Sequence, residues 1–322
     1  MGLALLVALA GTVRAQPASD SNQIPQFGTL VQVVAQSSSD SSADDGVQVA
    51  TARVSAEGAV RGGLTYELEA DVADGVALKD ARLDVRLSPA LVLSAGQFKT
   101  PFSYGTLAST AATPFVERPD AVNALELGRR VGAMLAVAVP SISLTVQGGV
   151  FNERPVLADA DPGRAGTALM SVGRATWEGA TPVGPASVGV NAAYGDAAAP
   201  RRRVAGFRFG ADVHLERKRA FLTAEVLRRS EAGSGEASSG AYVTVGYAVA
   251  GNHRLRVRLD RVVREAAPAP TAARSEAAST VVGFGYTFAP SWPVRLEADV
   301  LAPASDAAGQ SVSARVGLQV NL

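Results

Sequence analysis

Residues 91–130 read LVLSAGQFKTPFSYGTLASTAATPFVERPDAVNALELGRR, and this stretch decides how the rest of the chain is interpreted. Its first part, up to Lys99, alternates apolar and small residues as a β-strand does, and turn-forming residues follow until the apolar run VGAMLAVAV at 131–139. A connection of about thirty residues inside a regular β protein is usually either functional or disordered. This one carries aromatic and basic residues, namely Phe102, Tyr104, Phe115, Lys99, Arg118, Arg129 and Arg130. We therefore predict that it is ordered and folds against the rest of the protein.

Short segments in which apolar and polar residues alternate recur from Phe27 to the C-terminus. Such period-two alternation predicts β-strands with one apolar and one polar face. The predicted strands cover residues 27–37, 47–60, 64–73, 78–87, 91–98, 130–139, 142–152, 167–178, 186–195, 203–215, 220–229, 240–250, 254–265, 278–288, 294–301 and 310–322, which makes sixteen.

The connections between these strands alternate between tight and long. Tight ones include RGG at 61–63, PS at 140–141 and GNH at 251–253. The connections that alternate with these tight turns are mostly long polar segments, such as SDSSADDG at 39–46 and ERPVLADADPGRAG at 153–166. An even number of antiparallel strands with short turns at one end and long loops at the other is the arrangement of outer-membrane barrels. The sequence thus predicts an all-β fold, a transmembrane antiparallel up-and-down β-barrel of about 16 strands.

The faces of the predicted strands support this arrangement. In 254–260, Arg or Asp occupies every even position, whereas Leu255, Val257 and Leu259 occupy the odd ones. Unpaired charge is very costly to bury, so the ionic faces must contact water. A soluble sheet with one wet face would need a second layer over its apolar face, and the sequence predicts no helix to supply one. Aromatic residues near strand ends would form the interfacial girdle of a barrel: Trp177, Tyr194, Tyr286, Phe288 and Trp292.

Composition excludes several classes of protein. The 322 residues contain no cysteine, so the protein needs no disulfide. No segment after the N-terminal region offers eighteen uncharged apolar residues, which argues against a helical membrane protein. Thirty basic and thirty acidic residues give a net charge of zero, and this balance argues against nucleic-acid binding.

The chain opens with MGLALLVALAGTVRAQP, whose apolar core is too short to span a bilayer but suits a secretory signal. We predict a signal peptide over residues 1–15, a short segment over 16–26 and the barrel over 27–322.

No group of residues predicts catalysis or a cofactor. His214 and His253 lie near predicted turns, where an ordinary lumenal or exposed histidine is expected rather than a metal ligand or general base. Glu67 and Glu69 share one strand face, but the same acidic face recurs on other strands and indicates a wet wall. We therefore expect a protein that is not an enzyme.

The strings GQFKTPFS at 96–103, FVERPD at 115–120 and ELGRRVG at 126–132 resemble the signature region of the phosphate-selective porin O and P family. The resemblance extends upstream through 63–88 and covers roughly residues 54–135. It implies an outer-membrane porin in which the loop at 99–129 folds into the barrel and narrows a water-filled channel. It also implies a preference for anions such as phosphate, contact with outer-membrane lipid, and a homotrimer. The outward face of Val131, Ala133, Leu135 and Val137 is a candidate for the contact between subunits.

Basic residues are the candidates for anion recognition in such a channel. At the constriction the candidates are Lys99, Arg118, Arg129 and Arg130, and along the pore wall they are Arg82, Arg86, Arg208, Arg254, Arg256 and Arg258. The wall arginines could instead pair with lumenal acids such as Asp80, Asp84 and Asp260. Because acids share the predicted lumen with these arginines, we expect a modest anion preference and weak phosphate specificity.

Two alternatives remain open at this point. The first is a non-porin outer-membrane barrel with a blocked lumen and a role in adhesion or assembly. The second is a secreted, soluble, β-rich binding module.

Overall fold

The structure is a computed structural model that describes residues 24–40, 45–60, 62–152, 169–196, 205–231, 236–265, 276–291, 293–304 and 311–322. The expected signal peptide at 1–15, and residues 16–23 of the segment after it, lie outside the described residues, as does Trp292.

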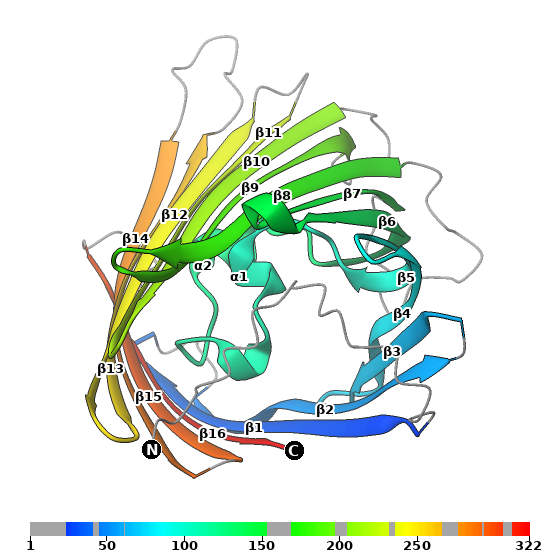
Figure 1. Cartoon of the computed structure of the whole chain (residues 1–322). Coiled ribbons are helices and arrows are strands. Elements are labelled where there is room, and N and C mark those ends of the chain that lie inside the picture. The colour runs from blue at the N-terminus through cyan, green and yellow to red at the C-terminus, as the bar shows by residue number, and fades with distance from the viewer. Residues whose placement is uncertain are drawn as a thin grey trace.

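Sixteen strands form one closed antiparallel barrel, which confirms the predicted fold class and strand count (Figure 1). The strands are β1 (Gln26–Ser38), β2 (Gly46–Val60), β3 (Leu64–Asp71), β4 (Ala77–Ser88), β5 (Leu91–Lys99), β6 (Arg129–Val139), β7 (Leu144–Asn152), β8 (Leu169–Thr181), β9 (Gly184–Asp196), β10 (Ala205–Arg217), β11 (Ala220–Glu231), β12 (Ala237–Ala250), β13 (His253–Glu265), β14 (Glu276–Ser291), β15 (Val294–Pro303) and β16 (Ser313–Asn321). The predicted strand ends differ from the observed ones by three residues or fewer.

The barrel closes because the first and last strands pair with each other. Leu30 of β1 lies opposite Asn321 of β16, and the pairing continues to Ser38 opposite Ser313. Leu322 also donates its N–H to the Thr29 carbonyl at 2.9 Å. Closure leaves no strand edge with unpaired backbone groups, which a sheet inside a bilayer requires.

Helices occur mainly in the connection between β5 and β6, residues 100–128, which we call the inner loop. It contains α1 (Tyr104–Leu107), the 3-10 helix η1 (Thr110–Ala112) and α2 (Asp120–Leu125), and a further 3-10 helix, η2 (Pro140–Ile142), lies in a short turn. Within the described part of the chain, no helix is both long and apolar enough to cross a membrane. In Figure 1, α1 and α2 lie inside the ring of strands.

The predicted alternation of faces is confirmed on β13. Leu255, Val257 and Leu259 are about half exposed on the outer face, whereas Arg256, Arg258 and Asp260 are buried inside the barrel. Exposed aromatic residues lie toward both ends of the outer face, among them Tyr194, Phe207, Tyr247 and Tyr286. An apolar outer face with aromatic residues near its ends is what lipid contact requires.

The inner face is less uniform than a water-filled lumen would need. Met134 of β6, Phe151 of β7 and Val172 of β8 point inward and are buried in one apolar cluster with residues of the inner loop. In β6 both faces of the strand are therefore apolar, since Ala133 and Leu135 face outward. A strand with two apolar faces indicates that something covers the inner one, and here the inner loop does.

The outer face gives a direct test of this orientation. We expect Leu68→Arg, on the outer face of β3, to destabilise the barrel by about 2–4 kcal/mol because a guanidinium near the bilayer midplane is costly. Thr65→Arg, on the inner face of the same strand, should be tolerated because water reaches it. Urea unfolding in lipid vesicles measures both changes, and equal destabilisation would show that the facing is wrong.

Candidate pore constriction

The inner loop packs against the lumenal side of β11, β12 and β13 through α2. Ala121, Val122 and Leu125 of α2 are fully buried, and the same apolar cluster contains Leu227 and Tyr242 from the wall. Burying an aliphatic side chain of this size contributes roughly 1.5–3 kcal/mol. The apolar face of α2 is thus enough to hold the loop on this side of the barrel.

Glycines on the wall let the loop approach closely. A Cβ atom on Gly240 of β12 would lie 2.8 Å from the Cβ of Ala121. A Cβ atom on Gly283 of β14 would lie 3.1 Å from the ring of Phe115. The wall therefore has no side chain at the points where α2 and Phe115 contact it.

Three carboxylates on alternate strands accept hydrogen bonds from the loop backbone. Glu225 of β11 accepts from the N–H groups of Tyr104 at 2.9 Å and Gly105 at 3.1 Å. Asp260 of β13 accepts from Asp120 and Ala121 at the start of α2. Asp299 of β15 accepts from Val116 at 2.7 Å. Since the first N–H groups of a helix lack partners within it, these carboxylates satisfy donors that would otherwise be buried and unpaired.

Arginines on the wall donate to loop carbonyl groups in the same way. Arg208 of β10 contacts the carbonyl oxygens of Leu125 and Glu126, each at 3.1 Å. Arg258 of β13 donates to Glu117 O at 2.8 Å, and Arg295 of β15 donates to Ala111 O at 2.7 Å and also to Thr113 O. Charged donors and acceptors on the wall therefore fix the loop backbone along most of its length.

Phe115 connects these two sets of contacts. Its buried ring lies under the guanidinium groups of Arg256 and Arg258, with 5.0 Å and 4.6 Å from the guanidinium carbon to the ring centroid. Arg256 also pairs with Glu297 at 2.6 Å and with Asp299 at 2.9 Å. Cation–π contacts of desolvated arginines are worth about 2 kcal/mol, so Phe115 stabilises the middle of the loop against β13 and β15.

The four predicted constriction residues lie in different surroundings. The Lys99 ammonium donates to Leu107 O at 3.2 Å and to Ala108 O at 2.9 Å, and Arg118 also donates to Ala108 O at 2.9 Å. Lys99 and Arg118 are thus brought together at one carbonyl group. Burial lowers the pKa of Arg118, although a guanidinium remains charged at neutral pH.

Arg129 and Arg130 are directed elsewhere. Arg129 pairs with Asp80 at 2.6 Å and with Glu69 at 3.0 Å. Arg130 is buried and donates to Leu127 O at 3.0 Å and to Asn152 O at 3.4 Å, on the side of β7. Arg130 thus supports the C-terminal end of the inner loop, whereas Arg129 joins the acids of β3 and β4.

The predicted wall arginines divide into groups. Arg208, Arg256 and Arg258 contact the inner loop as described above. Arg82 pairs with Glu67 and Asp84, each at 3.0 Å, as the alternative of pairing with lumenal acids predicts. Arg254 lies over the ring of Phe221 at 5.4 Å, and Arg86 is half-buried on β4.

The two histidines occupy ordinary packed positions. His214 contacts the Thr223 hydroxyl at 2.8 Å and stacks on Tyr104, with 5.5 Å between ring centroids. His253 contacts the Tyr286 hydroxyl at 2.6 Å. Across the described residues there is no group of histidine, cysteine or acidic side chains that could hold a metal ion.

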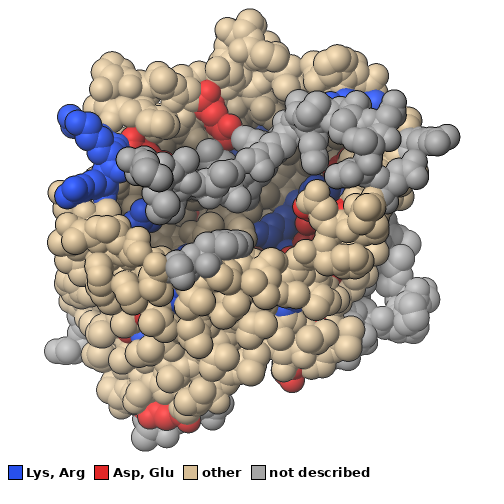
Figure 2. Space-filling model, turned by 60° about the horizontal axis from the view of Figure 1, so that its bottom comes forward, with Lys and Arg blue, Asp and Glu red and all other residues tan. Residues whose placement is uncertain are grey.

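The wall of β2, β3 and β4 carries a separate ionic network. Arg53 pairs with Asp71 at 3.1 Å and with Glu69 at 3.4 Å, and it donates to the Thr110 hydroxyl of the inner loop at 3.2 Å. Together with the pairs of Arg82 and Arg129, it places both signs of charge on this wall. Figure 2 shows basic and acidic side chains next to each other in the hollow of the molecule.

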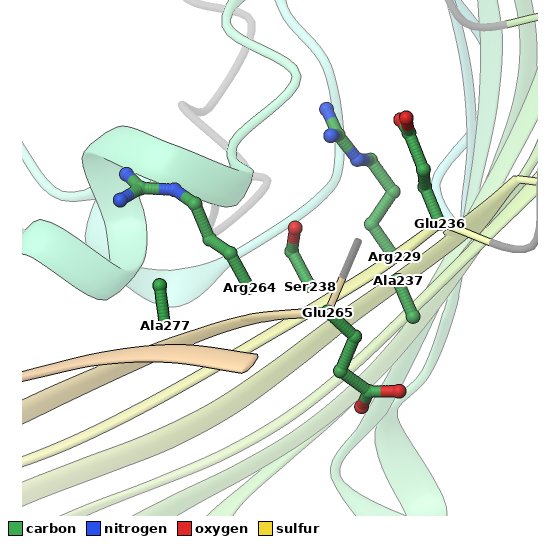
Figure 3. Close-up of a pocket in the computed structure, with 7 residues that line it drawn as sticks. All are labelled: Arg229, Glu236, Ala237, Ser238, Arg264, Glu265 and Ala277. Atoms are coloured by element: carbon green, nitrogen blue, oxygen red, sulfur yellow. The ribbon is translucent and has the colours of Figure 1, made fainter. Parts of the chain in front are cut away.

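A small cavity lies at the end of the barrel where β11 meets β12 and β13 meets β14 (Figure 3). It has a volume of about 250 Å³ and is lined by Arg229, Glu236, Ala237, Ser238, Arg264, Glu265 and Ala277. Arg229 and Arg264 are both in register with Ser238, so one lateral row of the sheet places both arginines in this cavity.

Sequence reasoning did not find the contacts that anchor the loop. Strand alternation places Glu225, Asp260 and Asp299 on the lumenal face, but their backbone partners lie 121, 140 and 183 residues away in the chain. No local pattern reports such a distant pairing. The one available signal was the apolar inner face of β6, which indicates that a segment covers the wall there.

Residues 29–292 match the model of the family described as phosphate-selective porin O and P. The chain belongs to this family. This match confirms the resemblance seen in the sequence, and it indicates that the protein is an outer-membrane porin. No curated protein matches the chain in sequence.

Solved structures share the fold of this porin at low sequence identity. An anion-selective porin from Comamonas acidovorans has 14% identity and a TM-score of 0.71, with 93% of this chain and 99% of that chain covered. The outer membrane channel DcaP of Acinetobacter baumannii has 10% identity and a TM-score of 0.67, with 92% and 97% covered. In-vitro folded OmpT of Vibrio cholerae in its trimer form has 12% identity and a TM-score of 0.63, with 93% and 99% covered.

The carboxylate anchors predict a measurable change in loop protection. We expect Glu225→Gln to speed amide hydrogen exchange at residues 104–107 by roughly 10- to 100-fold, since a hydrogen bond to a charged group is worth about 1.5–3 kcal/mol. Glu57→Gln removes an exposed carboxylate of β2 and is the matched control. Unchanged exchange in Glu225→Gln, measured by mass spectrometry, would mean that this carboxylate does not hold α1.

The close approach at Gly240 predicts a second effect. We expect Gly240→Val to destabilise the porin by about 1–3 kcal/mol, because the added side chain overlaps Ala121 and Leu125 of α2. Gly148→Val on β7 places the same side chain in open space and should have little effect. Urea unfolding of both variants tests this, and equal stability would contradict the observed packing of α2.

Proposed function

We propose that this porin forms a water-filled channel for passive diffusion of small solutes, with a modest preference for anions at the inner loop and weak specificity for phosphate. The observation that carries the proposal is the position of Lys99 and Arg118. Both direct their charged groups to carbonyl oxygens at the start of the inner loop, and neither makes an ion pair among the described contacts. No described acid is therefore paired with either of these basic groups.

The polar contacts of Arg118 add support. One of its guanidinium nitrogens, Nη1, is buried and has no hydrogen-bond partner within the described residues. Buried donors are normally satisfied, whereas this guanidinium keeps a donor, and with it positive charge, that no described hydrogen-bond acceptor offsets. In a narrow aqueous path with low-dielectric walls, two cations raise the local concentration of anions.

The neighbouring wall keeps the preference modest. The charged residues on β2, β3 and β4, together with Arg129 beside them, are Arg53, Lys79, Arg82, Arg86 and Arg129 against Glu57, Glu67, Glu69, Asp71, Asp80 and Asp84. The acids outnumber the bases on this side. A solute that passes Lys99 therefore also meets the acids of this neighbouring wall, which weakens selection by sign alone.

The comparisons support the solute class in part. The family description names phosphate selectivity, and one similar structure is titled an anion-selective porin. The arginines that contact the inner loop or pair with acids leave fewer bases free for a phosphate path. We therefore infer general anion passage in preference to a phosphate-specific site.

We also infer that the porin assembles as a homotrimer in contact with outer-membrane lipid. A similar structure is titled a trimer form. The outer faces of β5 and β6 carry the apolar residues Leu93, Ala133 and Leu135. Together they form an apolar surface that could pack against a neighbouring barrel. Mass measured in native detergent micelles tests this inference, and a monomer would contradict it.

Electrical measurements on reconstituted channels test the solute preference. Across a potassium chloride gradient, we expect a reversal potential of the sign that indicates anion preference. The double change Lys99→Gln and Arg118→Gln should move it toward cation preference, whereas Arg217→Gln at the turn end of β10 should leave it unchanged.

Other outcomes of the same experiment decide between the alternatives. A cation-selective wild-type channel would contradict the proposal, and strong block of chloride current by micromolar phosphate would show a phosphate-specific site. An electrically silent protein would favour a barrel with a blocked lumen.

A further inference from the structure

Two arginines point outward from a wall that is otherwise apolar. Leaving aside the residues at the strand ends, the outward positions of β10 to β14 carry apolar, small or hydroxyl side chains except at Arg228 and Arg261. The Arg228 side chain is 59% exposed. Arg261 is exposed, and its neighbours Asp260 and Val262 are buried inside the barrel, so Arg261 faces outward.

The register of the sheet places both arginines toward the long-loop end. Arg228 lies in one lateral row with Phe209 on one side and Ser239 on the other. A second lateral row, formed by Tyr247 of β12 and Leu255 of β13, lies toward the short-turn end. Along β12, Tyr247 is eight residues from Ser239. Eight residues at about 3.3 Å each span roughly 26 Å along the strand, and a strand tilt of about 40° reduces this to roughly 20 Å of height. The Arg228 row therefore lies near the top of a lipid-facing band about 25 Å tall.

Among the described residues, little acidic charge lies beside these arginines. Arg228 lies 4.0 Å from Glu265, at the limit of an ion pair, and Arg261 makes no ion pair among the described residues. A guanidinium in the hydrocarbon is costly, but its long side chain can extend along the wall to the bilayer interface. That interface holds the charged headgroups of the lipid.

We infer that this face, formed by Phe207, Phe209, Arg228 and Arg261, binds the phosphorylated headgroup of a lipid in the membrane leaflet at the long-loop end. A guanidinium matches a phosphate group with two parallel hydrogen bonds. The exposed rings of Phe207 and Phe209 lie beside Arg228 on β10, where they can contact acyl chains.

The spacing of the two arginines suits a headgroup with more than one phosphate. Arg228 and Arg261 are two strands apart, roughly 10 Å across the sheet, and their rows are two residues apart, roughly 7 Å along it. The Cα atoms are then about 12 Å apart. Two long side chains at this distance can each hold one phosphate of a single lipid.

Native mass spectrometry of the full chain released from micelles tests the inference. The probe is cardiolipin, whose headgroup carries two phosphates, and phosphatidylcholine is the comparison lipid. We expect the wild-type porin to retain cardiolipin in preference to phosphatidylcholine. Arg228→Gln and Arg261→Gln should each weaken this retention about fivefold, and Arg228→Lys with Arg261→Lys should preserve part of it.

Arg264→Gln is the matched control, because Arg264 is an exposed arginine of the same strand that faces the lumen. It should leave lipid retention unchanged. Retention that is equal in the wild type and in the double glutamine variant would overturn the inference, and so would an equal loss in Arg264→Gln. Heat-modifiable gel mobility verifies that each variant is folded, so that a loss of retention reports on the lipid contact.

Discussion

Every backbone group of the inner loop must find a hydrogen-bond partner inside the barrel, and the rest of the structure depends on this constraint. Short helices satisfy part of the loop, and the wall satisfies much of the remainder. Glu225, Asp260 and Asp299 accept from loop N–H groups, and Arg208, Arg258 and Arg295 donate to loop carbonyl oxygens. A buried unpaired polar group costs about 1–3 kcal/mol. Any other placement of the loop inside the barrel would break these contacts and would therefore be unfavourable.

The anchoring of the loop divides the charges of the lumen into two sets. Several of those on β10 to β15 hold the loop, and some of these are almost fully buried, such as Arg258 and Asp260. Those on β2 to β4 form ion pairs along the wall, with Arg53 connecting this network to Thr110 of the loop. A lumenal charge is thus a structural residue or a channel residue according to which side of the loop it faces. This division explains why a wall rich in arginine need not produce strong selection for anions.

Much of the fold was predictable because its signals are local. Strand positions follow from alternation within each segment, as in 254–260, and the closed barrel follows from the even count with alternating tight and long connections. The length of the inner loop and its aromatic and basic residues predicted that it is ordered, and the family resemblance implied its place inside the barrel. The contacts of the individual arginines were less predictable. Arg256 and Arg82 both lie on strands that alternate charged and apolar residues, but Arg256 contacts Phe115 of the loop whereas Arg82 pairs with Glu67 of the neighbouring strand. Those contacts depend on where the loop lies after the barrel closes.

The inner loop is fixed on β11 to β15, and we propose that the water-filled path runs along β2 to β4. Thiol modification tests it most directly, because the chain contains no cysteine and single cysteines can be introduced cleanly. Glu57→Cys places a thiol on the exposed lumenal side of β2, and Thr244→Cys places one at a position of β12 that is 2% exposed in the structure. The structure predicts that a small methanethiosulfonate reagent reacts with Glu57→Cys in the folded channel and lowers its current, while Thr244→Cys stays unmodified until the barrel is unfolded. Equal reaction at both positions would contradict the account.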